Sequence, residues 1–158
     1  MSQDQLRSDV QSSYSQVLED RLAEWSRRTG ITVEVWALPK ERLAGRIAAV
    51  VHGVIREVLQ EIERQAQART ICFALTVART GLRLTISDDD GGMTAKALEA
   101  LETRLLTGRA DLTRLGGRLS VNSVLGEGTT VSGALPPKAI KQYASEENVP
   151  VPASLADL

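Results

Sequence analysis

The residues whose types and spacing suit chemistry fall into three glycine-bearing segments and one pair of carboxylates. The segments are SDDDGGM (87–93), LGGR (115–118) and GEGTT (126–130), and each follows a predicted strand or helix or opens a strand. Glycine permits a positive φ and a close approach of the backbone, which loops that cradle a ligand require. Ordinary turns use the same freedom, so each segment taken singly predicts a ligand loop or a turn.

The carboxylate pair is Glu57 and Glu61, which lie one helical turn apart in a segment with helical periodicity. Side chains four residues apart share one face of a helix, so both can address one site. The alternative is a solvated helix face that continues through Glu63 and Arg64.

One histidine and one cysteine restrict the metal and redox chemistry of the chain. They are too few for a structural zinc cluster, and a single cysteine cannot form an internal disulfide. Cys72 alternates with Phe73 and is expected in the core, and His52 is expected to pack against another helix. Trp25 and Trp36 are also expected in the core or between a helix and the sheet.

Hydrophobic periodicity and turn residues predict the elements that must position these side chains. Four helices are expected over 5–29, 41–68, 93–106 and 109–115, and five strands over 31–38, 71–78, 82–87, 118–124 and 129–135. Strands paired in hairpins, with helices between them, are typical of an α+β protein. The predicted fold is a two-layer α/β sandwich: a mixed, mostly antiparallel sheet with helices on one face, plus an N-terminal amphipathic helix.

The two ends of the chain differ in character from its middle, residues 31–137. In the N-terminal unit, 1–30, the helix over 5–29 has an apolar face that either folds onto its own domain or forms a homodimer. Four of the five prolines lie from residue 136 onward, and residues 138–158 have little periodicity. That segment is expected to be a flexible C-terminal tail.

The composition excludes several classes of function. With 158 residues, 42% of them hydrophobic, the chain is expected to form one globular domain. A formal charge of -1 and 3% aromatic residues disfavour nucleic acid and anionic membranes as partners. No apolar run approaches the roughly 18 residues that a membrane helix needs, and the first ten residues lack the apolar core of a secretory signal. A cytoplasmic location is therefore expected.

Taken in order, the motifs resemble a known family. RRTGITVEVWAL, VIREVLQEIERQAQA, GLRLTISDDDGGM and LTRLGGRLSVNSVLGEGTTVSGALP follow one another between about Leu18 and Leu135. Together they resemble the ATP-binding domain shared by sensor histidine kinases, gyrase-type ATPases and a class of heat-shock chaperones. The likeness is greatest to sensor kinases with a short lid over the nucleotide. Residues 31–137 are thus expected to be a histidine-kinase-like ATPase domain, with ATP and Mg²⁺ as cofactors.

The resemblance implies roles for six residues. Glu57 stands at the family's catalytic glutamate, which orients or activates the attacking group. Glu61 stands where the family has an asparagine that coordinates Mg²⁺, and Asp88 stands at the aspartate that accepts a hydrogen bond from the adenine amino group. Pocket-lining positions fall on Gly92, Gly108 and Thr129. A register that uses Asp89 and Gly91 in place of Asp88 and Gly92 is the alternative.

The sequence departs from the family pattern in each nucleotide motif. Gln65 replaces a basic residue or histidine, and Asp90 replaces a glycine. The lid motif Gly-Leu-x-Gly is replaced by Arg104-Leu105-Leu106-Thr107, with Gly108 displaced by one position. A carboxylate at Glu61 is a hard oxygen ligand for Mg²⁺, but it also adds negative charge near the triphosphate.

Two functions follow from the resemblance and these departures. The first is an ATP-binding domain of sensor histidine kinase type in bacterial signal transduction, a protein kinase or ATPase without sensor and phosphoacceptor regions. The alternative is a catalytically inactive pseudo-kinase that acts as a protein–protein interaction or regulatory module. The expected partners are a response regulator, a kinase or another regulator, and a second copy of the chain through 5–29.

Overall fold

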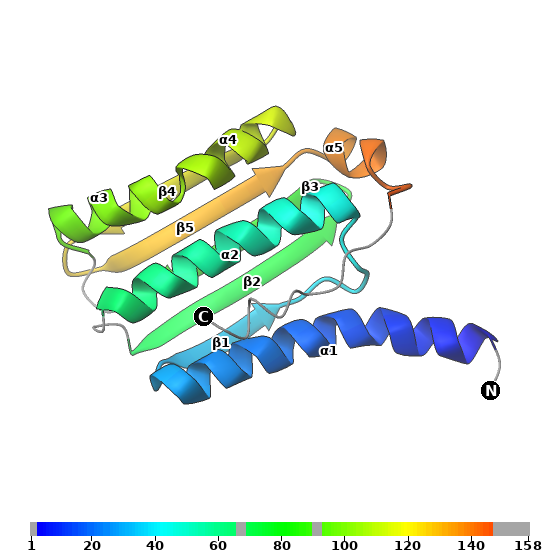
Figure 1. The fold of residues 1–158 in the computed structure, drawn as a ribbon, viewed down its shortest axis with the longest axis horizontal. Helices are drawn as coiled ribbons and strands as arrows, with labels where there is room; N and C mark the ends of the chain where they lie inside the picture. The colour runs from blue at the N-terminus through cyan, green and yellow to red at the C-terminus, as the bar shows by residue number, and fades with distance from the viewer. Residues whose placement is uncertain (1–2, 66–68, 90–92, 147–158) are drawn as a thin grey trace.

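Helices cover one face of a five-stranded sheet in the computed structural model, which describes residues 3–65, 69–89 and 93–146 (Figure 1). The elements, in chain order, are α1 (Gln3–Thr29), β1 (Thr32–Ala37), α2 (Gly45–Gln65), β2 (Thr70–Ala78), β3 (Gly81–Asp88), α3 (Ala95–Arg104), α4 (Leu106–Arg114), β4 (Arg118–Val124), β5 (Gly128–Leu135) and α5 (Pro137–Gln142). The predicted α+β sandwich is confirmed, with every predicted helix and strand present.

The strands lie in the order β1-β2-β3-β5-β4. β1 and β2 are parallel and are joined through α2, whereas the other neighbours are antiparallel. Alternate side chains such as Phe73, Leu84 and Val131 are buried beneath the helices. The opposite side, which we call the open face, carries no helix of the described chain. Mixed pairing with helices on one side is the arrangement that the sequence predicted.

Helix α1 packs onto its own domain through one face. Tyr14, Leu18, Leu22 and Trp25 lie on that face and are buried in the core that they share with α2 and the sheet. Gly30 ends the helix with a φ of 78° while its N–H donates to the Ser26 carbonyl. The apolar stripe from Tyr14 to Trp25 is therefore used within the chain.

Two residues expected in the core lie on the open face instead. The side chain of Trp36 is 72% exposed, and Cys72 is half-buried beside it rather than among the core residues. Both predictions were wrong because strand alternation separates two faces without saying which one the helices cover. The predictions for Trp25 and His52 are confirmed, because both are buried where helices pack.

The contact between α1 and α2 contains a buried polar pair. The Tyr14 hydroxyl and Nε2 of His52 are 2.8 Å apart and form a hydrogen bond inside an otherwise apolar layer. Burial lowers the pKa of His52 from 6.5 to about 4 and raises the pKa of Tyr14. The imidazole is therefore neutral in the folded protein at neutral pH.

The beginning of α2 is fixed by residues that follow α5. Glu146 accepts a hydrogen bond from the Arg46 backbone N–H, and its carboxylate lies 3.5 Å from Nε of Arg46. The Arg46 guanidinium also stacks 4.7 Å from the centre of the Tyr143 ring. Residues 138–146 are thus docked on the domain, in contrast to the flexible tail expected over 138–158, of which 147–158 lie outside the described residues.

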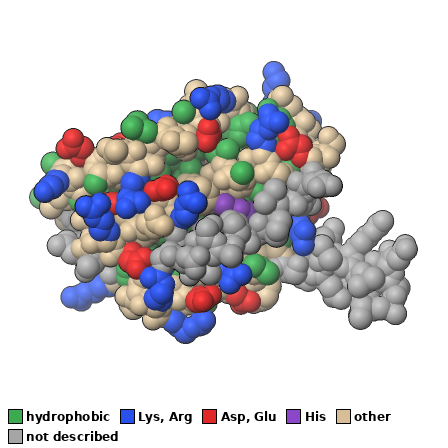
Figure 2. All heavy atoms as spheres, in the orientation of Figure 1, with side chains coloured by type: hydrophobic (Ala, Val, Ile, Leu, Met, Phe, Trp, Pro, Cys, Tyr) green, Lys and Arg blue, Asp and Glu red, His purple; other side chains and the backbone are tan. Residues whose placement is uncertain are grey.

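The helix-covered side of the molecule shows positive and negative side chains interspersed with one another (Figure 2). No helix in the described part of the chain is both long and apolar enough to cross a membrane.

Stability is expected to fall as the pH decreases from 6.5 to about 4, because the unfolded chain binds a proton on His52 that the folded chain does not bind. At pH 4.5 this amounts to roughly 2–3 kcal/mol. His52→Leu removes the titrating group but keeps an apolar side chain in the layer. Urea unfolding at about pH 7 and pH 4.5 should show a larger loss for the wild type than for His52→Leu; equal losses would contradict the prediction.

Candidate functional site

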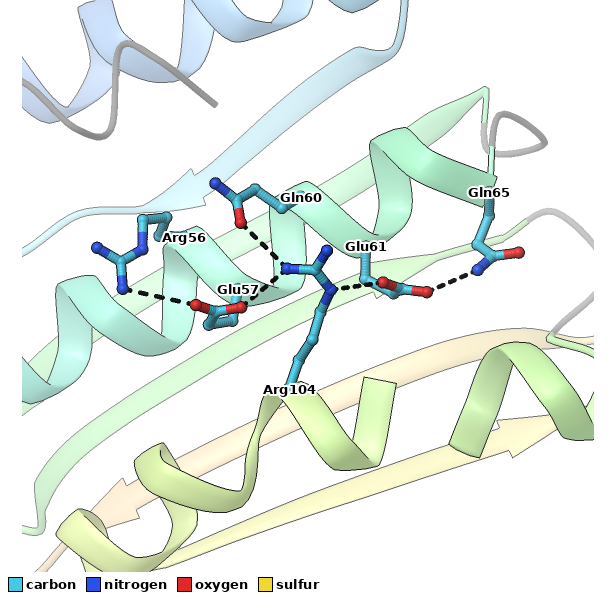
Figure 3. Close-up of polar contacts among 6 residues, drawn as sticks. All are labelled: Arg56, Glu57, Gln60, Glu61, Gln65 and Arg104. Atoms are coloured by element: carbon cyan, nitrogen blue, oxygen red, sulfur yellow. Dashed lines mark hydrogen bonds and ion pairs between the residues drawn. The ribbon is translucent and has the colours of Figure 1, made fainter. Parts of the chain in front are cut away.

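The two carboxylates predicted to share a helix face are brought together by an arginine from another helix (Figure 3). Arg104, the last residue of α3, donates through Nε to Glu61 at 2.7 Å and through one terminal nitrogen to Glu57 at 3.0 Å. The same terminal nitrogen donates to the Gln60 amide oxygen at 3.1 Å. Gln65 donates to the other oxygen of Glu61 at 2.7 Å. We call these five residues the Arg104 network.

Glu61 is fully buried, with 0% of its side chain exposed, so the interpretation as a solvated helix face is wrong for this residue. A buried carboxylate needs a positive partner and hydrogen bonds to its oxygens, and here Arg104 and Gln65 supply them. Glu57 and Arg104 are partly exposed at the mouth of the network. Burial alone would lower the pKa of Arg104, but the hydrogen bonds and charges of Glu57 and Glu61 raise it, so the guanidinium keeps its charge.

Helix α4 lies close against α2 at Val54, on the N-terminal side of the Arg104 network. A Cβ built on Gly108 would lie 2.8 Å from a methyl group of Val54, which leaves no room for a larger residue unless one helix moves. Residues 104–108, expected from the resemblance to replace a glycine-rich lid, are the end of α3 and the first turn of α4. Gly108 thus has a packing role in the structure, and its assignment to a nucleotide pocket stays a prediction.

Asp88 and Thr129 are brought together at one end of the sheet. Asp88 ends β3 and lies directly opposite Thr129 of β5, on the side of the sheet that the helices cover. The strands approach so closely here that a Cβ on Gly128, whose φ is 109°, would lie 2.1 Å from the Asp88 carbonyl oxygen. Asp89 follows on the opposite side of the strand, so only Asp88 faces the helical layer.

The hydroxyl of Thr129 already has a partner within the chain. It lies 2.8 Å from the Ser123 hydroxyl, which accepts a hydrogen bond from the Met93 backbone N–H at 2.9 Å. Thr129 is buried and ties the segment before α3 to the sheet. Gly92, the remaining predicted pocket residue, lies outside the described residues together with Gly91.

The structure shows one residue of the candidate site that the sequence did not assign. Arg104 was noted only as a departure from the lid motif, and its partners are 43 and 47 positions away, beyond the reach of helical periodicity. The one signal for Arg104 in the sequence was a charged residue at a position where the resembled family has a glycine. Within the described residues, no three side chains of the His, Cys, Asp or Glu type gather into a group that could hold a metal ion.

Removing Arg104 is expected to destabilise the fold. Arg104→Met leaves the buried charge of Glu61 without its cation and should lower the free energy of unfolding by about 3 kcal/mol. The double variant Arg104→Met/Glu61→Gln removes both charges and should recover much of this loss. Urea unfolding of the wild type, both single variants and the double variant measures the coupling between the two residues.

Arg56→Met is the matched control, because Arg56 contacts Glu57 from the exposed side at 3.5 Å. An exposed ion pair contributes little, so this variant should lie within about 0.5 kcal/mol of the wild type. Equal effects of Arg104→Met and Arg56→Met would mean that Glu61 does not depend on Arg104.

Comparison with known proteins adds no family to this geometry. No family model matches the chain, and no curated protein matches it. The resemblance to histidine-kinase-like ATPase domains stays a prediction from the motifs quoted above.

Proposed function

We propose that this protein is a catalytically inactive module of the histidine-kinase-like ATPase type, in which an internal ion-pair network stands in place of the nucleotide site, and that it acts by binding another protein. The observation that carries the proposal is the pairing of Arg104 with Glu61 at 2.7 Å. A response regulator, a kinase or another regulator is the kind of partner that the resemblance implies.

The two paired residues stand at two positions where the sequence departs from the resembled pattern. Glu61 takes the place of the Mg²⁺-binding asparagine, and Arg104 takes the place of the first lid glycine. A glutamate alone at the first position would be an unpaired buried charge, and an arginine alone at the second would lack its strongest partner. The two replacements compensate each other, which supports a site rebuilt for stability.

The ion pairs of the network leave no cation for a nucleotide. Arg104 is held by Glu57 and Glu61, and Arg56 lies 3.5 Å from the other oxygen of Glu57. A triphosphate needs a cation or a set of free backbone donors. Mg²⁺ binding by Glu61 would require Arg104 to leave a buried carboxylate, and α4 packs against α2 beside it. The release of Glu61 by Arg104 and the close packing of α4 both weaken the binding of Mg²⁺ and nucleotide, relative to a site whose metal ligands have no other partner.

Calorimetric titration of ATP, with and without Mg²⁺, tests the proposal on the 158-residue chain. The expected result is no saturable heat at millimolar nucleotide and an unchanged melting temperature. The melting temperature is an independent readout, because a ligand at 100 times its Kd adds about 2.7 kcal/mol to the free energy of unfolding.

Asp88→Asn is the control variant, since Asp88 is the residue predicted to read adenine. Saturable binding to the wild type that Asp88→Asn abolishes would overturn the proposal and establish the ATP-binding function. Small, equal heats with both proteins are expected of nucleotide contacts elsewhere on the surface and agree with an inactive site.

A further inference from the structure

The middle of the open face of the sheet is lined by small side chains. Its middle row, read across four paired strands, consists of Ala74, Thr85, Ser132 and Ser120. Small residues allow another surface to approach the sheet closely, as in stacked sheets about 10 Å apart. The charged side chains of this face stand toward its two ends.

One end of the open face is acidic. Glu34 of β1 accepts hydrogen bonds from Nε1 of Trp36 at 3.4 Å and from Sγ of Cys72 at 3.6 Å, which places all three side chains on this face. Asp89 follows β3 at the same end, and burial together with the charges of Glu34 and Asp89 raises the pKa of the Cys72 thiol. Glu127, in the turn between β4 and β5, adds a third carboxylate at this end.

The other end is basic. Arg83 of β3 and Arg118 of β4 both lie opposite Ala134 of β5, so the two arginines flank a small residue in one row across the sheet. Arg79 lies in the turn between β2 and β3 at the same end. All three side chains are exposed, and none forms an ion pair within the described part of the chain.

We propose that the open face binds a second copy of this chain in an isologous dimer. Three acidic and three basic residues at opposite ends make the face complementary to itself, because a two-fold axis through the middle row sets each acidic end on the partner's basic end. Because that axis runs along the row, the strands of the two sheets are antiparallel and nearly aligned, as in aligned sheet packing. The helix-covered side offers no such separation, since its charges are interspersed (Figure 2).

Trp36 gives this surface an apolar anchor. Its side chain is 72% exposed, which is unusual for a tryptophan outside an interface, and tryptophans are frequent among residues that dominate binding. Five strands about 4.8 Å apart and roughly seven residues long give a projected area of about 500 Å² per copy. Two such areas total about 1,000 Å², which is below the standard size of a stable interface, so a weak dimer that forms at high protein concentration is expected.

In this dimer the contact between copies is the open face, and not the helix over 5–29 that was expected from the sequence. The stripe of α1 from Tyr14 to Trp25 is buried in its own domain, so it is not free for a second copy. The proposed dimer is also independent of the Arg104 network, which lies on the opposite side of the sheet.

Sedimentation equilibrium over roughly 10–500 µM tests the dimer with complementary charge reversals. Arg83→Glu/Arg118→Glu makes both ends acidic, and Glu34→Arg/Asp89→Arg makes both ends basic. Each variant alone is expected to be monomeric, whereas an equimolar mixture is expected to form a 1:1 heterodimer that weakens at high salt. Trp36→Ala should weaken the wild-type dimer at least tenfold.

Arg27→Glu/Arg64→Glu is the matched control, because it makes the same change of net charge at exposed positions on α1 and α2. It should dimerise like the wild type. A wild-type protein that stays monomeric, a dimer that survives the reversal of Arg83 and Arg118, or a mixture without heterodimer would overturn the proposal. Circular dichroism of each variant separates a lost contact from a lost fold.

Discussion

The helical layer depends on the buried carboxylate of Glu61. A charge with no exposure to water must be paired where it lies, and the cation comes from the last residue of α3. The end of α3 therefore lies over the C-terminal half of α2. Because α4 begins two residues later, its first turn arrives against Val54, where only a glycine at position 108 fits. One ion pair thus fixes the relative position of three helices.

Residues near both ends of the described chain also hold the N-terminal half of α2 in the helical layer. α1 contributes Tyr14, whose hydroxyl satisfies one nitrogen of the buried His52 on α2. Glu146, which follows α5, caps the first turn of α2 with a carboxylate, where the helix dipole favours negative charge. α2 is held along its length by partners that are 38 to 100 positions away in the chain. Long-range polar contacts thus position the element that carries the candidate site.

The sequence predicted the elements better than it predicted their surroundings. Helical and strand periods are local properties, so α1 to α4 and all five strands were found within a few residues. α2 begins at Gly45 rather than at 41, and its first turn binds the carboxylate of Glu146, a contact that no local pattern reveals. Arg104 was missed as the partner of Glu61 for the same reason. Trp36 and Cys72 were assigned to the wrong face because alternation alone does not show which face is covered.

The distribution of charge partners separates the two faces of the protein. On the helix side, residues such as Arg28, Arg104 and Arg109 meet carboxylates of their own chain at 2.7–3.0 Å. On the open face, Arg83 and Arg118 have no such partner within the described residues, and the Glu34 carboxylate of this face lies toward the other end of the sheet. Exposed charges without partners cost little in water, and they set the orientation of any molecule that approaches. A side that is internally neutralised contributes stability, whereas a side with separated charges is suited to recognition.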